Sequence, residues 1–151
     1  MPVNKIKMAY FAGFFDGEGC IQILPHSRKP RKDGTKLNNP SYALTCCVGS
    51  TNEWILNSFQ FAFGGKVYPN REAKNSRSKV WAWTIWSRQA LVFLKAISPY
   101  LTLKSGEAEV AIRFQLRKGA KGLFITDKEK VVEKAEAILV KELKRRNKCP
   151  Q

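Results

Sequence analysis

Two carboxylates lie close together in the segment Asp16-Gly17-Glu18-Gly19, which directly follows an apolar stretch of the chain. Carboxylate oxygens are ligands that Mg²⁺ prefers, and a bound Mg²⁺ can neutralise a phosphate and activate water. An acidic residue in such a turn can instead serve as a cap or turn former, and this alternative applies more to Asp16 than to Glu18. The segment therefore predicts metal-dependent phosphate chemistry, a local structural role, or a division of both between the two acids.

The apolar stretch before these acids predicts a helix that is buried on two sides. At 100° per residue it separates into a stripe of large side chains and, nearly opposite, a stripe that contains two glycines: Met8, Phe11 and Phe15 against Tyr10, Gly13 and Gly17. Large side chains suit the core of the same domain, whereas glycines let a second backbone approach closely. Each glycine costs a helix about 1 kcal/mol, so we expect a second helix to pack there and compensate.

The charge of the chain points to a polyanionic partner. Its 151 residues include 27 Lys and Arg against 12 Asp and Glu, which gives a formal net charge of +15. Nucleic acid would absorb such a surplus through phosphate contacts, although a solvated basic surface is the simpler alternative. We expect DNA as the partner, and neither a membrane nor a small-molecule substrate.

The spacing of the cysteines and the hydropathy of the chain argue against several other classes of protein. Cys20, Cys46, Cys47 and Cys149 show no paired C-x-x-C spacing and His26 is the only histidine, which argues against structural zinc and favours reduced thiols. No stretch approaches the roughly 18 apolar residues of a membrane span. The short apolar run at 8–15 lacks a cleavage site behind it, so an intracellular protein is expected, in a compartment left open.

Alternation of apolar and polar residues predicts two hairpins, each with a basic tip. Strands are expected over about 20–24, 41–48, 66–73 and 79–87, and helices over about 8–18, 51–63, 88–97, 104–118 and 127–148. Ser50 or Thr51 is the expected cap of the second helix, and Thr126 with Glu129 forms a capping box for the last. In the fourth strand, Trp81, Trp83 and Ile85 share a face that we assign to the core. Four antiparallel strands covered by helices on one face make an α+β domain.

The uncovered face of this sheet is the expected DNA-binding surface, because a two-stranded ribbon fits the major groove. A strand of nine residues spans roughly 30 Å, which matches about nine base pairs and hence half of a long site. The residues predicted to touch base edges are Gln22, Leu24, His26, Arg28, Thr45, Tyr68, Asn70 and Glu72. Those predicted to hold phosphates are Arg31, Lys32, Lys36, Lys74, Arg77 and Lys79.

The nine residues from Phe11 to Gly19, F-A-G-F-F-D-G-E-G, resemble the signature of the LAGLIDADG homing endonucleases. The resemblance implies an αββαββα core with a saddle-shaped sheet, and the expected element order fits it up to about residue 118. We therefore expect one domain over residues 1–151, with a core at about 5–118 and a helical extension at about 119–151. The segment from Ser98 to Lys104 is similar to a second landmark of the family.

The resemblance also implies roles for individual residues. Glu18 stands at the family's metal-binding position, Gly17 would add its backbone carbonyl, and Mg²⁺ is the expected cation. Lys104 matches the family's active-site lysine, which polarises water or stabilises developing charge. Where the family often has Gln and a basic residue before the second helix, this chain has Ser50 and Asn52, so either would have to position the water.

The chain contains one copy of the motif, whereas single-chain members carry two. A lone motif implies a homodimer built on Tyr10, Gly13, Phe14 and Gly17, and hence a near-palindromic target. Family members, which are often intron-encoded, make double-strand breaks across the minor groove with short 3′ overhangs. The alternatives are a maturase-type RNA-binding protein that assists splicing without cleavage and a non-catalytic DNA-binding repressor. The presence of Glu18 favours the nuclease.

Overall fold

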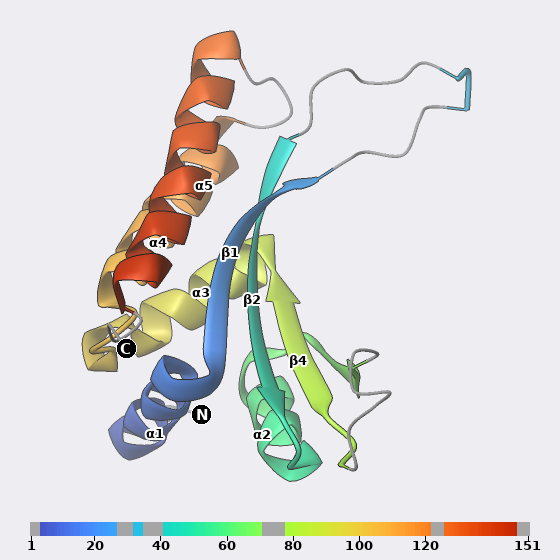
Figure 1. Ribbon diagram of the computed structural model, residues 1–151, viewed down its shortest axis with the longest axis vertical. Helices are drawn as coiled ribbons and strands as arrows, with labels where there is room; N and C mark the ends of the chain where they lie inside the picture. Colours follow the sequence, from blue (N-terminus) through green and yellow to red (C-terminus); the bar gives the residue numbers. More distant parts are fainter. Residues whose placement is uncertain (1–3, 27–31, 35–40, 71–77, 122–125, 148–151) are drawn as a thin grey trace.

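A four-stranded antiparallel sheet carries its helices on one face (Figure 1). The computed structural model describes residues 4–26, 32–34, 41–70, 78–121 and 126–147, and the side chains of these except at 119–121. Its helices and strands, in chain order, are α1 Lys5–Glu18, β1 Gly19–His26, β2 Ser41–Ser50, α2 Glu53–Phe63, β3 Lys66–Pro69, β4 Trp81–Trp86, α3 Ser87–Ile97, a 3-10 turn Ser98–Tyr100, α4 Ser105–Lys121 and α5 Asp127–Asn147. This order confirms the predicted α+β layout.

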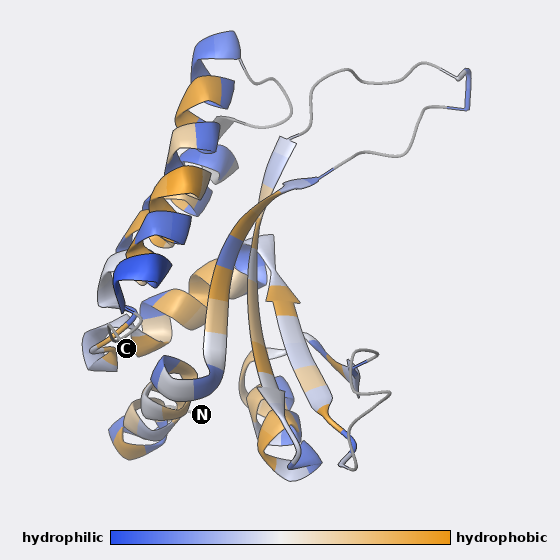
Figure 2. Ribbon diagram, viewed as in Figure 1, coloured by the Kyte–Doolittle hydropathy of each residue, from blue (hydrophilic) through white to orange (hydrophobic). Residues whose placement is uncertain are grey.

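The strands are arranged in the order β1-β2-β4-β3, so the two hairpins meet along β2 and β4. In the first hairpin Gly19 pairs with Val48 and His26 pairs with Ser41. Along β1 a hydrophilic band interrupts the hydrophobic residues (Figure 2), and Ile21 and Ile23 are buried while Leu24 and His26 are exposed. One face of the sheet therefore packs on the helices, and the other carries the polar side chains.

The core is formed where α1, α2 and α3 cover the sheet. Phe59 of α2 lies 4.7 Å from Phe11 of α1 and 5.0 Å from Trp83 of β4, measured between ring centroids, and Trp83 lies 5.1 Å from Phe93 of α3. Edge-to-face contacts of this kind add about 0.5–1.5 kcal/mol each to the burial of the rings. Trp83 also donates its indole N–H to the carbonyl of Gly64 at 2.8 Å. The prediction that these tryptophans belong to the core is confirmed for Trp83, which is fully buried.

Two predicted boundaries were wrong. The N-cap of α2 is Asn52, whose Oδ1 accepts the N–H of Trp54 at 3.0 Å, and not Ser50 or Thr51. Ser50 ends β2 instead and pairs with Trp81, so its backbone belongs to the sheet. In the second hairpin β4 spans 81–86 and is shorter than the expected 79–87, while β3 spans 66–69 and the expected strand residues 71–73 lie outside the described residues. The predicted end of α2 is confirmed, because Gly64 adopts a φ of 78°, which favours glycine.

Helices α4 and α5 lie side by side along the edge strand β1 (Figure 1). The capping box at the start of α5 is confirmed, since Thr126 N–H donates to Glu129 Oε2 at 2.8 Å and Glu129 N–H donates to Thr126 Oγ1 at 3.3 Å. Arg117 and Glu136 join the two helices through a bidentate ion pair. Hydrophilic residues are interspersed with hydrophobic ones along α5 (Figure 2). Within the part of the chain that the structure describes, no helix is long and apolar enough to cross a membrane.

Candidate active site

The two acids of the motif, Asp16 and Glu18, both lie in the last turn of α1 but differ in exposure. Met8, Phe11 and Phe15 are buried, as the stripe of large side chains predicts, while Gly13, Gly17 and Tyr10 are exposed. Helix α1 stops at Glu18, and Gly19 starts β1 in tight contact with the helix. A Cβ at Gly19 would lie 2.5 Å from the carbonyl oxygen of Phe15, so only glycine fits this junction.

Asp16 anchors the segment that leads into α4. It is only 9% exposed, and its Oδ2 accepts the backbone N–H groups of Thr102 at 2.7 Å and Leu103 at 3.1 Å. Its Oδ1 accepts the N–H of Lys104 at 3.0 Å. Hydrogen bonds to a charged acceptor contribute about 1.5–3 kcal/mol each. The capping alternative is therefore the structural role of Asp16, although its partners lie far away in the sequence.

Lys104 lies beside the end of α1. Its Nζ donates to the backbone carbonyl of Asp16, and its own carbonyl accepts the N–H of Ala108 in the first turn of α4. Glu18, two residues after Asp16, is exposed. The structure thus brings the predicted acid and the predicted lysine to one end of one helix.

Ser50 and Asn52 contact each other at the start of α2. Asn52 N–H donates to Ser50 Oγ at 3.1 Å, and Asn52 Oδ1 is used as the helix cap. These bonds occupy one acceptor of each side chain, and a role for either in positioning water stays a prediction.

The described residues form only part of a metal centre. Among the side chains of the described ranges, no group of three or more His, Cys, Asp or Glu is arranged to hold a metal ion. The donors available at the end of α1 are the Glu18 carboxylate and the Gly17 carbonyl. The latter lies in the last turn of the helix, where carbonyls have no intrahelical partner. These hard oxygen donors suit Mg²⁺, but one subunit supplies only part of a coordination shell.

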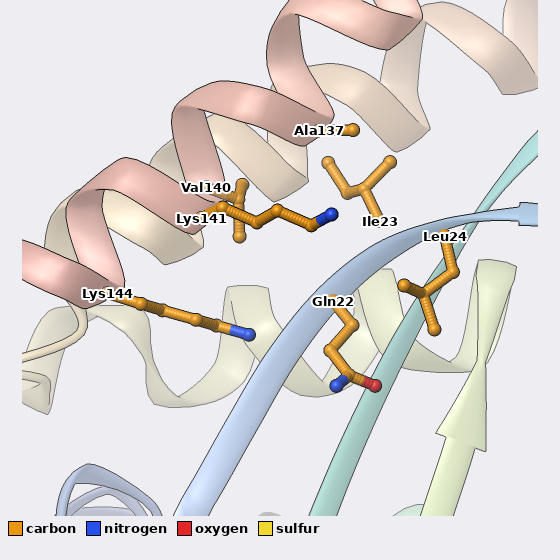
Figure 3. Close-up of a pocket in the computed structure, with 7 residues that line it drawn as sticks. All are labelled: Gln22, Ile23, Leu24, Ala137, Val140, Lys141 and Lys144. Atoms are coloured by element: carbon orange, nitrogen blue, oxygen red, sulfur yellow. The ribbon is translucent and has the colours of Figure 1, made fainter.

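The C-terminal end of α5 reaches the same region. Asn147 Nδ2 donates to the carbonyl of Leu103 at 2.7 Å and to Glu107 Oε1 at 3.2 Å. Lys144 Nζ lies 3.1 Å from Cys20 Sγ. Lys141 and Lys144 extend from α5 toward β1, beside a pocket that Gln22 and Leu24 also line (Figure 3). No pattern in the sequence indicated these contacts, because they join segments about 40 or more than 120 residues apart.

Several ionisable groups around this end of α5 have shifted pKa values. The pKa of Cys20 is lowered to about 5, first by a hydrogen bond from Cys47 and also by Lys144, against the opposing effect of burial. The same hydrogen bond raises the pKa of Cys47. Burial raises the pKa of Glu107, which Asn147 and Lys144 partly offset. The described cysteines Cys20, Cys46 and Cys47 form no disulfide, as predicted.

The described part of the predicted DNA-binding set lies on β1, β2 and β3 and in the segments beside the strands. Gln22 lies opposite Thr45 in the register of β1 and β2, and both are half-buried. Leu24, His26, Lys32, Tyr68 and Lys79 are exposed, and Asn70 is half-buried. Tyr68 shares a hydrogen bond with Thr84 at 2.8 Å, and Lys79 Nζ lies 4.1 Å from the centre of the Trp81 ring. The remaining predicted residues lie outside the described residues: Arg28, Arg31, Lys36, Glu72, Lys74 and Arg77.

A comparison with protein families identifies the chain. The family model of the LAGLIDADG endonuclease matches residues 11–109, from the motif in α1 to the start of α4 and hence well over half of the chain. This chain belongs to the LAGLIDADG endonuclease family. It is accordingly a site-specific DNA endonuclease, and the predicted family and enzyme class are confirmed. A search of curated proteins found no significant match.

Solved structures of homing endonucleases share the fold of this LAGLIDADG protein. I-CvuI, in complex with a DNA target, aligns with a TM-score of 0.71 and 23% identity over 92% of this chain and 82% of its own. The archaeal intron-encoded I-Vdi141I, complexed with DNA, aligns with a TM-score of 0.72 and 12% identity over 91% and 84% of the two chains. I-TnaI aligns with a TM-score of 0.64 and 18% identity over 96% of each chain. The α+β fold expected for the family is confirmed.

Proposed function

We propose that this protein is a homodimeric homing endonuclease that makes a double-strand break in a long, near-palindromic DNA site by metal-dependent phosphodiester hydrolysis. The observation that carries the proposal is the placement of Glu18 and Lys104 at one end of α1. Glu18 is exposed there, and the bonds of Asp16 hold Lys104 against the same helix turn. A hydrolytic site needs an acid and a cation within reach of one phosphate, and the location of Glu18 and Lys104 at one helix end supports such an arrangement.

The proposed dimer packs along α1. Gly13 and Gly17 are exposed, and a Cβ at either would meet no atom of the chain within 4 Å, so the surface is flat and open. Tyr10, 56% exposed, and the half-buried Phe14 flank the glycines with apolar surface. A twofold axis here would bring the two Glu18 residues together and account for the single motif. I-SmaMI is consistent with this arrangement, since the chain covers only 42% of its length, which leaves room for a second such unit.

Mg²⁺ or a similar cation would be held by Glu18 and the Gly17 carbonyl of each subunit together with DNA oxygens. When bound, it would supply charge neutralisation at the scissile phosphate and an activated water. I-CvuI structures in the presence of Mg or Ca support the choice of a divalent cation. Within the protein, Asp16 orients Lys104, whose ammonium stabilises negative charge that develops on the phosphate. Ser50 and Asn52 are proposed to order water near this position.

DNA would lie on the uncovered face of the sheet. The net charge of +15 per chain, doubled in a dimer, favours association with a polyanion. Gln22 and Thr45, adjacent across β1 and β2 on this face, are placed to read base edges in the major groove. Lys32 and Lys79 would hold phosphates at its margin. I-CvuI and I-Vdi141I, which share the fold, are both seen with DNA.

The proposal is tested by incubating the purified protein with a randomised DNA library and Mg²⁺ and sequencing the cut ends. The wild type should give defined ends with short 3′ overhangs, whereas Glu18→Gln should bind the same DNA without cutting it. Ends that appear equally with Glu18→Gln, or DNA binding without Mg²⁺-dependent ends in the wild type, would overturn the nuclease assignment. Binding of intron RNA without any DNA cleavage would instead support a maturase. Sedimentation on the selected DNA should show two subunits per site.

A further inference from the structure

Cys20 and Cys47 face each other across the first hairpin. They are direct partners in the antiparallel register of β1 and β2, and both are half-exposed. Their side chains lie on the uncovered face, because their neighbours Ile21 and Cys46 point into the core. Direct pairing on one face of the ladder brings the two thiols close together.

This pairing suits a disulfide. Directly opposed residues of an antiparallel ladder have Cα atoms about 4.5 or 5.5 Å apart, and disulfides span Cα separations of about 4.4–6.8 Å. Their Cβ atoms lie about 4.5–5.5 Å apart in a regular ladder, against about 3.5–4.5 Å in a disulfide. A small contraction of the hairpin is therefore sufficient, and the backbone register need not change.

The third described cysteine shows by contrast what distinguishes this pair. Cys46 is next to Cys47 in sequence but fully buried on the other face. Lys144 Nζ lies 3.1 Å from Cys20 Sγ, so the pair also borders α5. The pair Cys20–Cys47 thus combines two directly opposed thiols with access to solvent.

We infer that Cys20 and Cys47 are a redox-sensitive thiol pair that closes to a reversible disulfide when the DNA-free protein meets a peroxide-class oxidant. One thiol of the pair attacks one oxygen of the peroxide, the O–O bond breaks, and its sulphur becomes a sulfenic acid as the second oxygen leaves as water. The other thiol then attacks this sulphur, the S–O bond breaks, and a second water leaves. Two thiols lose two electrons and two protons, and the peroxide is reduced to two waters.

The pair also occupies a sensitive position if the proposed function holds. Cys20 is two residues from Glu18 and Cys47 is next to Val48, the partner of Gly19 in the register, so both lie beside the proposed cleavage centre. Contraction of the hairpin would displace the contact surface for DNA, and displacements of about 1 Å near reacting groups cost up to a hundredfold in rate. Oxidation should therefore lower DNA cleavage, and a thiol reductant should restore it. This consequence rests on the proposed function, whereas the disulfide itself does not.

The chemical test uses the full chain carrying Cys149→Ser, so that a thiol outside the described residues does not contribute. After hydrogen peroxide and then N-ethylmaleimide under denaturing conditions, the intact mass should show one disulfide, a loss of about 2 Da, and one labelled thiol. Peptide mapping should join Cys20 to Cys47. Cys20→Ser and Cys47→Ser, made separately, should abolish the linkage, and Cys46→Ala should retain it. A disulfide through Cys46, or over-oxidation of Cys20 without any linkage, would overturn the inference.

A second experiment measures the rate at which each variant cleaves the selected DNA before and after oxidation. The oxidised sample of each variant is compared with the reduced sample of the same variant. The parent should lose about tenfold or more of its cleavage rate on oxidation and recover it with dithiothreitol. Cys47→Ser, which cannot close the bond, should show no reversible loss. If the disulfide forms but cleavage is unchanged, the regulatory consequence is wrong while the thiol pair stands. Absence of cleavage in every reduced sample would contradict the proposed function, and the mass result would still decide the disulfide.

Discussion

Asp16 and Lys104 form two reciprocal hydrogen bonds between side chain and backbone. Asp16 Oδ1 accepts the backbone N–H of Lys104 at 3.0 Å, and Lys104 Nζ donates to the backbone carbonyl of Asp16. The contact joins α1 to the start of α4 across 88 residues of sequence. It fixes the distance between the end of α1, where Glu18 is exposed, and the lysine. The two acids of the motif therefore differ in role because one is enclosed by N–H donors and the other faces solvent.

Asp16→Asn should destabilise the fold by about 2–4 kcal/mol, because an amide keeps one acceptor but turns an NH₂ group toward backbone N–H donors. The free energy of unfolding in urea measures this loss. Glu18→Gln is the matched control, since the side chain is exposed and the change should stay within about 0.5 kcal/mol. Equal losses in the two variants would contradict the division of roles between these acids.

Gly13→Arg should leave the fold of the subunit intact but prevent dimerisation. A Cβ at Gly13 meets nothing within 4 Å in the chain, and arginine in place of glycine favours a helix by about 0.8 kcal/mol. Sedimentation equilibrium should give a monomer, and double-strand cleavage should fall with it. Ala135→Arg, at an exposed position of α5, is the control and should remain dimeric. A dimeric Gly13→Arg protein would refute the α1 seam.

Glu107→Gln should stabilise the protein in a pH-dependent way. Glu107 is 1% exposed, and its Oε2 has no hydrogen-bond partner among the described residues. Burial raises its pKa, while Asn147, Lys144 and Lys104 act in the opposite direction and Cys20 adds to the rise.

Because the folded-state pKa of Glu107 is raised, the carboxyl costs no stability below the unfolded value near 4.5 and costs progressively more as pH rises through the folded value. The variant should therefore match the wild type at about pH 4 and be more stable than the wild type at neutral pH. Thermal unfolding across this range measures the difference. A gain in stability that is greatest at acidic pH would contradict a raised pKa for Glu107 in the folded protein.

Asn147→Ala should weaken the docking of α5 on the active site. It removes the bonds to the Leu103 carbonyl and to Glu107, which together contribute about 1–3 kcal/mol. Because Leu103 precedes Lys104, kcat for DNA cleavage should fall more than DNA affinity. Arg146→Ala, an exposed change one residue earlier, is the control. Equal effects of both variants on kcat would indicate a general loss of charge or helix stability, and not positioning of Lys104.

The sequence alone was sufficient for the order of the elements and for the motif. Periodicities of 3.6 and 2 residues follow from local backbone geometry, so the stripe of Met8 and Phe15 and the alternation around Ile21 were visible without coordinates. The capping box at Thr126 was visible for the same reason, since its partners are three residues apart. The cap of α2 was placed too early because Ser50, Thr51 and Asn52 are all good N-cap residues, and only pairing of Ser50 with Trp81 assigns it to the sheet.

Tertiary structure decided which side chains share a site. The enclosure of Asp16 by residues 102–104, the contact of Lys144 with Cys20 and the bonds of Asn147 all join segments that meet only when the helices pack on the sheet. Such contacts depend on packing among many residues and leave no fixed spacing in the chain. The sequence thus determined that an acid stands at the end of α1, while packing determined which acid is enclosed and which is left for chemistry.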